Sequence, residues 1–194
     1  MRRNTEESWG SVSIGLHWTV AGLILLVQIP AGLAMLRVGQ GLLQDTLFTL
    51  HKNMGLIILL LVFFRLGWRL ANPVPRLPED LPALQARLAR LTHGLLYVLL
   101  ILLPVSGFLY TAFGGFPVPF LLLVDLGPLL PKNETLAAIW KVVHLGSIAA
   151  LALVLALHVL GALQHALIRR DGILQRMLGR RWRADEGTLS HPDR

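Results

Sequence analysis

The sequence predicts an all-α integral membrane protein, a four-helix bundle with both termini on the cytoplasmic side. Apolar residues make up 54% of its 194 residues and charged residues only 15%, whereas a soluble domain has about 25% charged residues. The mean hydropathy is +0.61. A soluble chain of this size has more surface to cover with polar groups than this composition provides, so a lipid environment fits it better.

Four apolar stretches are long enough to cross a bilayer, which takes about 20 helical residues. The expected spans lie at about residues 14–36, 47–70, 91–113 and 142–168. The first span includes Pro30, which is expected to kink it. The second includes Arg65, which lies either at membrane depth or at the membrane edge. The third and fourth contain no Asp, Glu, Lys or Arg.

The distribution of basic residues predicts the orientation of the spans. Fourteen of the eighteen Lys and Arg residues fall in the N-terminal tail, around the connection after the second span, or in the C-terminal tail. The other four are Arg37, Lys52, Lys132 and Lys141. Because basic residues favour the cytoplasmic side, we expect a multi-pass membrane protein with both termini in the cytoplasm. The basic residues flank apolar runs, so no nucleic-acid partner is expected.

The same reading divides the chain into a bundle at residues 1–178 and a basic, polar cytoplasmic tail at residues 179–194. Prolines and glycines break the apolar stretch in the loop at 114–141, which is expected to lie in the outer membrane interface. Residues 173–182 are basic and partly amphipathic, and they are expected to lie on the anionic inner surface.

Cysteine is absent, which excludes iron–sulfur clusters, thioether-linked haem, disulfides and thiolate zinc sites. Histidines are then the strong nitrogen ligands that remain, and ligating residues within membrane spans are functional candidates. Six of the seven lie on or beside the expected helices: His17, His51, His93, His144, His158 and His165. The seventh, His191, lies in the polar tail.

The expected directions of the spans sort these histidines by depth. His51 and His144 open helices that start outside, whereas His17 lies near the inner end of the first helix. His158 follows His144 by fourteen residues, which is nearly four turns and about 21 Å of helix, so both imidazoles leave the same face. This pattern predicts an outer pair, His51 with His144, and an inner pair, His17 with His158.

Two such pairs, stacked across a four-helix bundle, are suited to two b-type haems with histidine at both axial positions. Arg65 follows His51 by fourteen residues, so it is expected near the inner haem, where it could pair with a propionate. The alternative for Arg65 is a side chain that extends to the membrane edge. The alternative for the histidines is hydrogen bonding in helix contacts.

Two further histidines compete for the inner site. His93 and His165 lie closer to basic flanking residues than His17 and His158 do. Interfacial roles suit them better, such as hydrogen bonding to a quinone head group or a propionate, or carrying a proton.

Several short stretches then occur in a specific order along residues 11 to 178. They are Leu16-His17-Trp18, His51-Lys52-Asn53-Met54-Gly55, Arg65-Leu66-Gly67-Trp68-Arg69, Pro73-Val74-Pro75, His93-Gly94-Leu95-Leu96-Tyr97, Leu103-Pro104-Val105-Ser106-Gly107, Leu157-His158 and Asp171-Gly172-Ile173-Leu174-Gln175-Arg176-Met177. In this combination the chain resembles the prokaryotic cytochrome b-561 family of small four-helix, dihaem membrane proteins. The resemblance implies that His17, His51, His144 and His158 are the haem ligands.

The resemblance also implies electron transfer between membrane quinone and a second partner. That partner would be a small periplasmic electron donor or a redox protein, and lipid would surround the bundle. For some relatives the outer partner is superoxide, which implies an oxidoreductase. Four basic residues face three acidic ones on the expected outer side, and this balance attracts an anion only weakly. The alternatives are a cytochrome b subunit of a larger dehydrogenase or hydrogenase, and a non-redox membrane scaffold or transporter.

Overall fold

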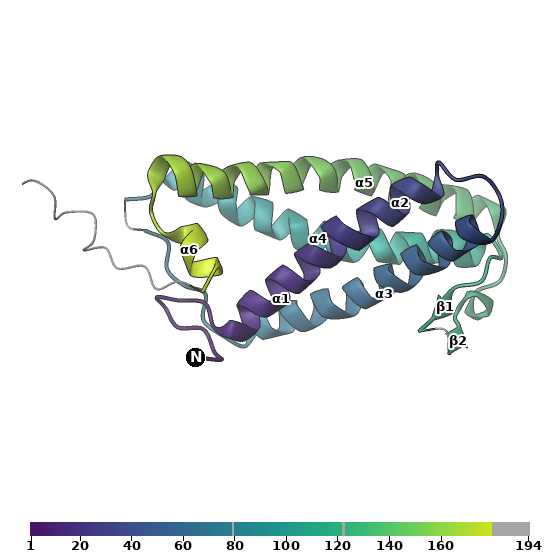
Figure 1. The fold of residues 1–194 in the computed structure, drawn as a ribbon, viewed down its shortest axis with the longest axis horizontal. Coiled ribbons are helices and arrows are strands. Elements are labelled where there is room, and N and C mark those ends of the chain that lie inside the picture. Colours follow the sequence, from purple (N-terminus) through teal and green to yellow (C-terminus); the bar gives the residue numbers. More distant parts are fainter. Residues whose placement is uncertain (79, 122, 180–194) are drawn as a thin grey trace, which may run out of the picture.

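The computed structural model describes residues 1–78, 80–121 and 123–179. Within them, four helical rods long and apolar enough to cross a membrane form an elongated bundle, as the sequence predicts (Figure 1). The first rod consists of α1 (Ser11–Gly22), the π-helical segment η1 (Leu23–Gln28) and α2 (Ile29–Met35). The other three are α3 (Leu42–Leu70), α4 (Ala83–Phe113) and α5 (Glu134–Leu163), which continues as the π-helical segment η3 (Gln164–Arg169).

Shorter elements close the two ends of the bundle. The loop between α4 and α5 contains β1 (Pro119–Phe120), β2 (Val124–Asp125) and the 3₁₀ turn η2 (Gly127–Leu129). The helix α6 (Ile173–Met177) follows η3. The N-terminus and α6 lie at one end of the bundle, called here the inner end, and the β1–β2 loop lies at the other, called the outer end (Figure 1). Which end faces the cytoplasm stays a prediction.

The irregularity expected at Pro30 is a π-helical segment that ends just before it. Pro30 lies in the first turn of α2, directly after η1. Proline has no N–H to donate and its ring crowds the preceding turn. A wider π-helical turn relieves that crowding without ending the helix.

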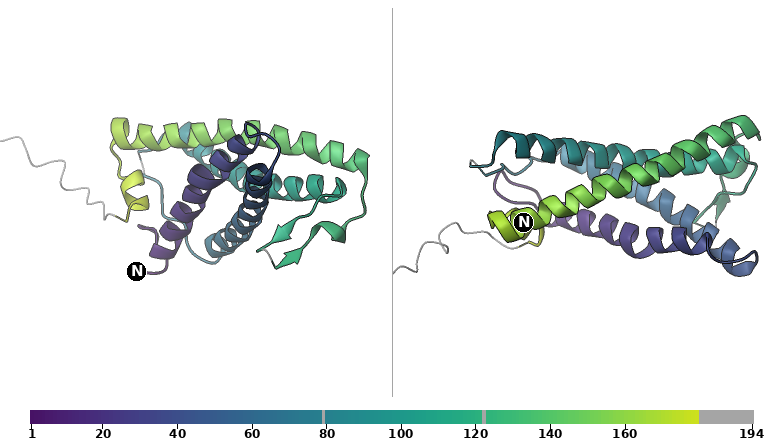
Figure 2. Two further views of the ribbon diagram at one scale, coloured as in Figure 1. Left: turned by 45° about the vertical axis from the view of Figure 1, so that its right-hand side comes forward. Right: turned by 90° about the horizontal axis from the view of Figure 1, so that it is seen from above.

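The rods pack largely in chain order. α4 and α5 lie along one another over the longest contact, α3 packs against α4, and the first rod packs against α3 (Figure 2). Val20, Ile24, Ile58 and Val62 form the buried core cluster between the first rod and α3. Among the described residues, the backbone of α5 makes little close contact with α1 or α3. Side chains therefore have to make the contacts between α5 and these two helices.

The outward faces of the rods are strongly apolar. Large exposed side chains occur on each rod, for example Leu26, Phe64, Leu95 and Leu157. Only 11–17% of the most apolar window of each rod is buried inside the bundle. Because such a surface is unstable in water, lipid covers it, and the chain is a multi-pass membrane protein.

All four rods begin earlier than expected, the first at Ser11 rather than 14. α3 begins at Leu42 rather than 47, α4 at Ala83 rather than 91, and α5 at Glu134 rather than 142. The start of α5 is capped by the Asn133 side chain, which accepts a hydrogen bond from the backbone of Leu136 at 3.0 Å. Hydropathy detects only the part of a helix that is apolar, and these polar first turns extend beyond it.

Specific contacts order the loop between α4 and α5, which was expected at the outer membrane interface. β1 and β2 pair antiparallel, with Pro119 opposite Asp125. Asn53 on α3 accepts a hydrogen bond from the backbone of Leu121 at 2.7 Å, and Lys52 donates to the carbonyl of Pro117 at 2.6 Å. These contacts hold the loop against the outer end of α3.

The segment expected on the inner surface is only partly described. α6 contacts the first rod, because the indole N–H of Trp18 donates to the carbonyl of Met177 at 2.8 Å. Arg176 donates to the carbonyl of Arg76, which lies before α4. Residues 180–194, which include His191 and nearly all of the expected tail, lie outside the described residues.

Candidate functional site

Two histidines meet near the outer end of the bundle. His51 is on α3 and His144 is on α5. Their ring centres are 6.5 Å apart and their planes are inclined at 86° (outer pair). Neither helix contributes a second histidine at this level, and the two rings meet across the bundle, consistent with the shared depth expected for them.

His144 is held in one orientation by its own surroundings. Its Nδ1 lies 3.0 Å from the carbonyl oxygen of Leu103 and 3.3 Å from the hydroxyl of Ser106. The carbonyl can only accept, so Nδ1 carries the proton and Nε2 keeps its lone pair. A Cβ added at Gly107 would lie 3.0 Å from Cε1 of this ring. A ring fixed through Nδ1 with Nε2 free is the usual arrangement of a metal-binding histidine.

His51 has a different set of neighbours. Its Nδ1 is buried without a hydrogen-bond partner. The amide of Gln28 donates to the backbone carbonyl of His51 at 3.1 Å, and its nitrogen lies 3.3 Å from His51 Nε2. A Cβ at Gly32 would lie 3.4 Å from the ring.

Gln28 was not among the expected site residues. The signal that could have identified it is an uncharged polar side chain within an apolar span, since such residues tend to be functional.

Three histidines gather near the inner end. His17 on α1 and His158 on α5 have ring centres 6.1 Å apart (inner pair). His93 on α4 is the most exposed of the three, and its ring centre lies 5.3 Å from that of His158. Nδ1 of His17 is buried without a hydrogen-bond partner.

Arg65 lies beside this inner group. Its charge is close enough to act on His17, His93 and His158. Its guanidinium carbon lies 5.9 Å from the ring centre of Tyr97. The arginine therefore lies at the level of the inner histidines, as its fourteen-residue distance from His51 predicted.

The spacing within each pair suits one metal between two imidazoles. A metal–imidazole bond is about 2 Å and the ring centre lies about 1 Å behind the nitrogen, so two opposed rings have centres about 6 to 6.5 Å apart. The inner and outer pairs, at 6.1 and 6.5 Å, match this value. His93 and His158, at 5.3 Å, are closer than it.

Each pair offers only two protein ligands, which favours a cofactor that supplies further metal ligands of its own. The described residues include no group of three or more His, Cys, Asp or Glu side chains placed to hold a metal ion. A haem iron has four porphyrin nitrogens and needs only two protein ligands. A pair of imidazoles with unpartnered or free ring nitrogens fits that requirement.

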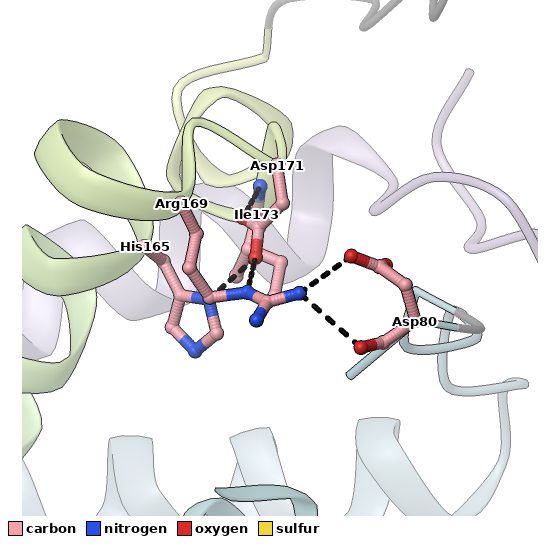
Figure 3. A network of polar contacts seen from close by, with 5 residues as sticks. All are labelled: Asp80, His165, Arg169, Asp171 and Ile173. Carbon is pink, nitrogen blue, oxygen red and sulfur yellow. Dashed lines mark hydrogen bonds and ion pairs between the residues drawn. The ribbon is translucent and has the colours of Figure 1, made fainter. Parts of the chain in front are cut away.

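His165 belongs to neither pair. Its Nδ1 lies 2.6 Å from Oδ2 of Asp171, and Arg169 donates from Nε to the same oxygen at 3.2 Å (Figure 3). Burial raises the pKa of Asp171, but hydrogen bonds from His165, Ile173 and Arg169 more than offset this and lower it overall. The carboxylate is therefore ionised at neutral pH.

Comparisons with known proteins agree with this architecture. The prokaryotic cytochrome b561 family model matches residues 8–180. Cytochrome b561 homolog 2 of Escherichia coli is 28% identical over 91% of this chain and 94% of its own length. Cytochrome b562 of Cereibacter sphaeroides is 31% identical over 89% of this chain and 96% of its own length. A probable superoxide oxidase of Yersinia pestis is 26% identical over 89% of this chain and 97% of its own length.

The family match extends over all four rods and both histidine pairs, so it covers the site as well as the fold. The absence of cysteine, the paired imidazoles and the four spans are all consistent with it. The chain belongs to the prokaryotic cytochrome b561 family and is a multi-pass membrane protein that binds b-type haem and transfers electrons.

Proposed function

We propose that this protein is a dihaem b-type cytochrome of the bacterial inner membrane that passes electrons between a one-electron partner at the outer face and membrane quinone. His51 and His144 bind the outer haem, and His17 and His158 bind the inner one. Arg65 pairs with a propionate of the inner haem. The observation that supports this most strongly is the recurrence of a 6.1–6.5 Å histidine pair at two levels.

The haem iron supplies the one-electron chemistry. The residues of the chain set the positions of the two centres, because α5 contributes one imidazole to each pair. His144 and His158 are fourteen residues apart on that helix, or about 21 Å. Two centres at this separation divide the bilayer into two shorter electron-transfer steps.

Superoxide is the outer partner that we favour, because a relative bears the name of a probable superoxide oxidase. It is a small anion that gives up one electron, which suits a one-electron acceptor near the outer face. Steering by charge is weak, since Lys132 is paired with Glu134 at 3.1 Å, and the carboxylates of Asp125 and Asp45 lie near Lys52. The reaction therefore depends on access to the outer haem more than on a positive surface.

Two measurements test this proposal. Reduced-minus-oxidised spectra of the purified protein, with haem and protein quantified, should show low-spin b-type haem at two per chain. Mixing the oxidised protein with superoxide should then produce reduced haem. A ratio of one haem per chain contradicts the dihaem arrangement, and a lack of haem reduction excludes superoxide as the donor.

A second candidate is the cytochrome b subunit of a larger dehydrogenase or hydrogenase. The outer loop offers apolar side chains that a soluble partner could cover, with Leu121 50%, Leu123 82% and Leu129 70% exposed. Purification in mild detergent should then yield a stable complex with a soluble redox subunit. Family membership argues against the third alternative, a non-redox scaffold or transporter.

A further inference from the structure

Gln28 brings a polar group of the first rod to the proposed outer haem site, to which that rod supplies no iron ligand. It is the last residue of the π-helical segment η1, and its side chain lies within an apolar span. Its amide oxygen is buried and, within the described residues, has no hydrogen-bond partner. Polar side chains at membrane depth tend to be functional, and π-helical turns are frequent at functional sites. Both findings mark Gln28 as a candidate functional residue.

The amide nitrogen of Gln28 contacts two atoms of His51. It donates to the backbone carbonyl at 3.1 Å and lies 3.3 Å from the ring atom Nε2. A carbonyl oxygen can only accept, so the nitrogen end of the amide is the end that faces His51. An amide nitrogen can only donate, so Nε2 accepts and the ring proton is on Nδ1. Gln28 therefore favours the tautomer in which Nε2 offers its lone pair.

Both imidazoles of the outer pair then offer the same nitrogen. The carbonyl of Leu103 holds the proton of His144 on Nδ1, which leaves Nε2 of that ring free to bind a metal. Thus α4 orients one ring and the first rod orients the other, although neither rod supplies a proposed outer ligand. The outer site is built by all four rods, because two supply the ligands and two orient them.

Two glycines leave the space in which Gln28 and His51 meet. A Cβ added at Gly55, one turn after His51 on α3, would lie 3.5 Å from the amide nitrogen of Gln28. A Cβ added at Gly32, one turn after Gln28 on the first rod, would lie 3.4 Å from Cε1 of His51. The amide and the ring therefore fill the room beside these two glycines. Gln28 is packed against His51 and does not extend towards lipid.

We propose that Gln28 is the positioning residue of the outer haem ligand His51. This proposal rests on the proposed function, which places the outer haem between His51 and His144. In the loaded protein Nε2 of His51 gives its lone pair to iron, while the amide keeps its hydrogen bond to the His51 carbonyl and stays against the ring. The N–H end of the amide is positive, so it favours the reduced centre, in which the iron has one positive charge less.

The competing explanation is that Gln28 only joins two helices. Polar side chains often do so in membranes, and the bond to the His51 carbonyl links the first rod to α3. Gln44 offers a comparison, because its amide nitrogen joins α3 to the end of the first rod. It donates to the carbonyls of Met35 and Val38 at 3.2 and 3.1 Å. In the part of the chain that the structure describes, its amide has no hydrogen bond to a histidine.

The test compares Q28M with Q44M in the purified holoprotein. Methionine is similar in length to glutamine but has no N–H to donate. We expect Q28M to lower the affinity for the outer haem about 10- to 100-fold, the usual effect of losing a residue that orients a metal-binding histidine. Transfer of haem to apomyoglobin measures this loss. The inner haem should transfer as slowly as in the wild type, which shows that the variant is folded, and Q44M should match the wild type at both haems.

Two spectroscopic measurements report on the ring and on the iron. The planes of His51 and His144 are inclined at 86°, and the EPR signal of an oxidised low-spin haem depends on this angle. Q28M should change the EPR signal of the outer haem alone. In a redox titration it should shift the reduction equilibrium of that haem about threefold towards the oxidised state, or about 28 mV. If Q28M does not fold, Q28N gives the comparison with Q44N, because it keeps an amide that is one methylene shorter.

Each other outcome overturns the proposal. Equal changes at both haems, or equal effects of the Gln28 and Gln44 variants, show that Gln28 only joins helices. An outer haem that keeps its affinity, EPR signal and potential in Q28M shows that His51 needs no positioning by this side chain. A failure of the proposed function looks different: the wild type then has fewer than two haems, or H51A retains both. Neither of those results involves a Gln28 variant.

Discussion

His144 donates its Nδ1–H to the carbonyl oxygen of Leu103, 3.0 Å away on the neighbouring helix α4. The same turn of α4 contains Gly107, where an added Cβ would lie 3.0 Å from the ring. One short stretch of α4 therefore both orients this imidazole and leaves room for it. This relationship distinguishes His144 from a histidine that only fills a helix contact, and it can be tested by substitution.

Gly107→Ala should perturb the outer haem. The new methyl group forces the His144 ring to move by a few tenths of an ångström, so we expect an altered spectrum and midpoint potential for one haem of the two. Gly146→Ala is the matched control on α5, because a Cβ there meets nothing within 4 Å. It should only stabilise the helix, by up to about 1 kcal/mol. Identical spectra for both variants would contradict this explanation of Gly107.

Removing single ligands should separate the two haems. His51→Ala or His144→Ala should lower the haem content from two per chain to one and retain the inner-haem spectrum. His17→Ala should also lower the haem content to one per chain, but it should retain the outer-haem spectrum. His93→Ala should keep both haems, because its ring lies only 5.3 Å from that of His158. If His93→Ala removes the inner haem, the inner pair is His93 with His158.

Arg65→Gln should lower the midpoint potential of the inner haem. Removing a nearby positive charge stabilises the oxidised iron, and a tenfold change in a one-electron equilibrium corresponds to about 59 mV. We expect a shift of tens of millivolts for one haem, with the other unchanged, in a redox titration. Arg65→Lys keeps the charge and should recover most of the potential. A shift of equal size in both haems would place Arg65 away from the inner site.

The Asp171 carboxylate should make the stability of the folded protein depend on pH, and only at acidic pH. Its pKa in the folded protein lies below the ordinary value of 3.8, so its contribution is complete above pH 3.8 and is lost as the pH falls through the folded pKa. Thermal unfolding in detergent between pH 6 and pH 3 should show a steeper loss of Tm in the wild type than in D171N. Parallel curves would mean that this carboxylate does not contribute.

The two carboxylates that bind Arg169 should differ in importance. Asp80 is 76% exposed and Asp171 only 8%. Solvent weakens the first pair, so Asp80→Asn should cost less than about 1 kcal/mol in free energy of unfolding. Asp171→Asn disturbs a buried, charged hydrogen bond and should cost about 1–3 kcal/mol. Equal costs, measured by reversible unfolding in a mixed detergent, would contradict this ranking.

Much of the fold could be predicted because a bilayer imposes simple rules. A span needs about 20 apolar residues, so the four spans and the membrane class follow from hydropathy. The helix starts at Leu42, Ala83 and Glu134 do not. A side chain caps the helix at Glu134, whereas the starts at Leu42 and Ala83 have no side-chain cap, and all three first turns lie outside the apolar stretch.

The sequence by itself determined that His144 and His158 share one face of a helix, because a fourteen-residue interval closes nearly four turns whatever surrounds it. It also determined that histidine is the strong metal ligand available, because cysteine is absent. Only the tertiary structure decided that His93 lies beside the inner pair, that Gln28 lies beside His51, and that Asp171 pairs with His165. The physical reason is that periodicity describes one helix at a time, whereas these contacts depend on how separate helices pack and how the chain turns between them.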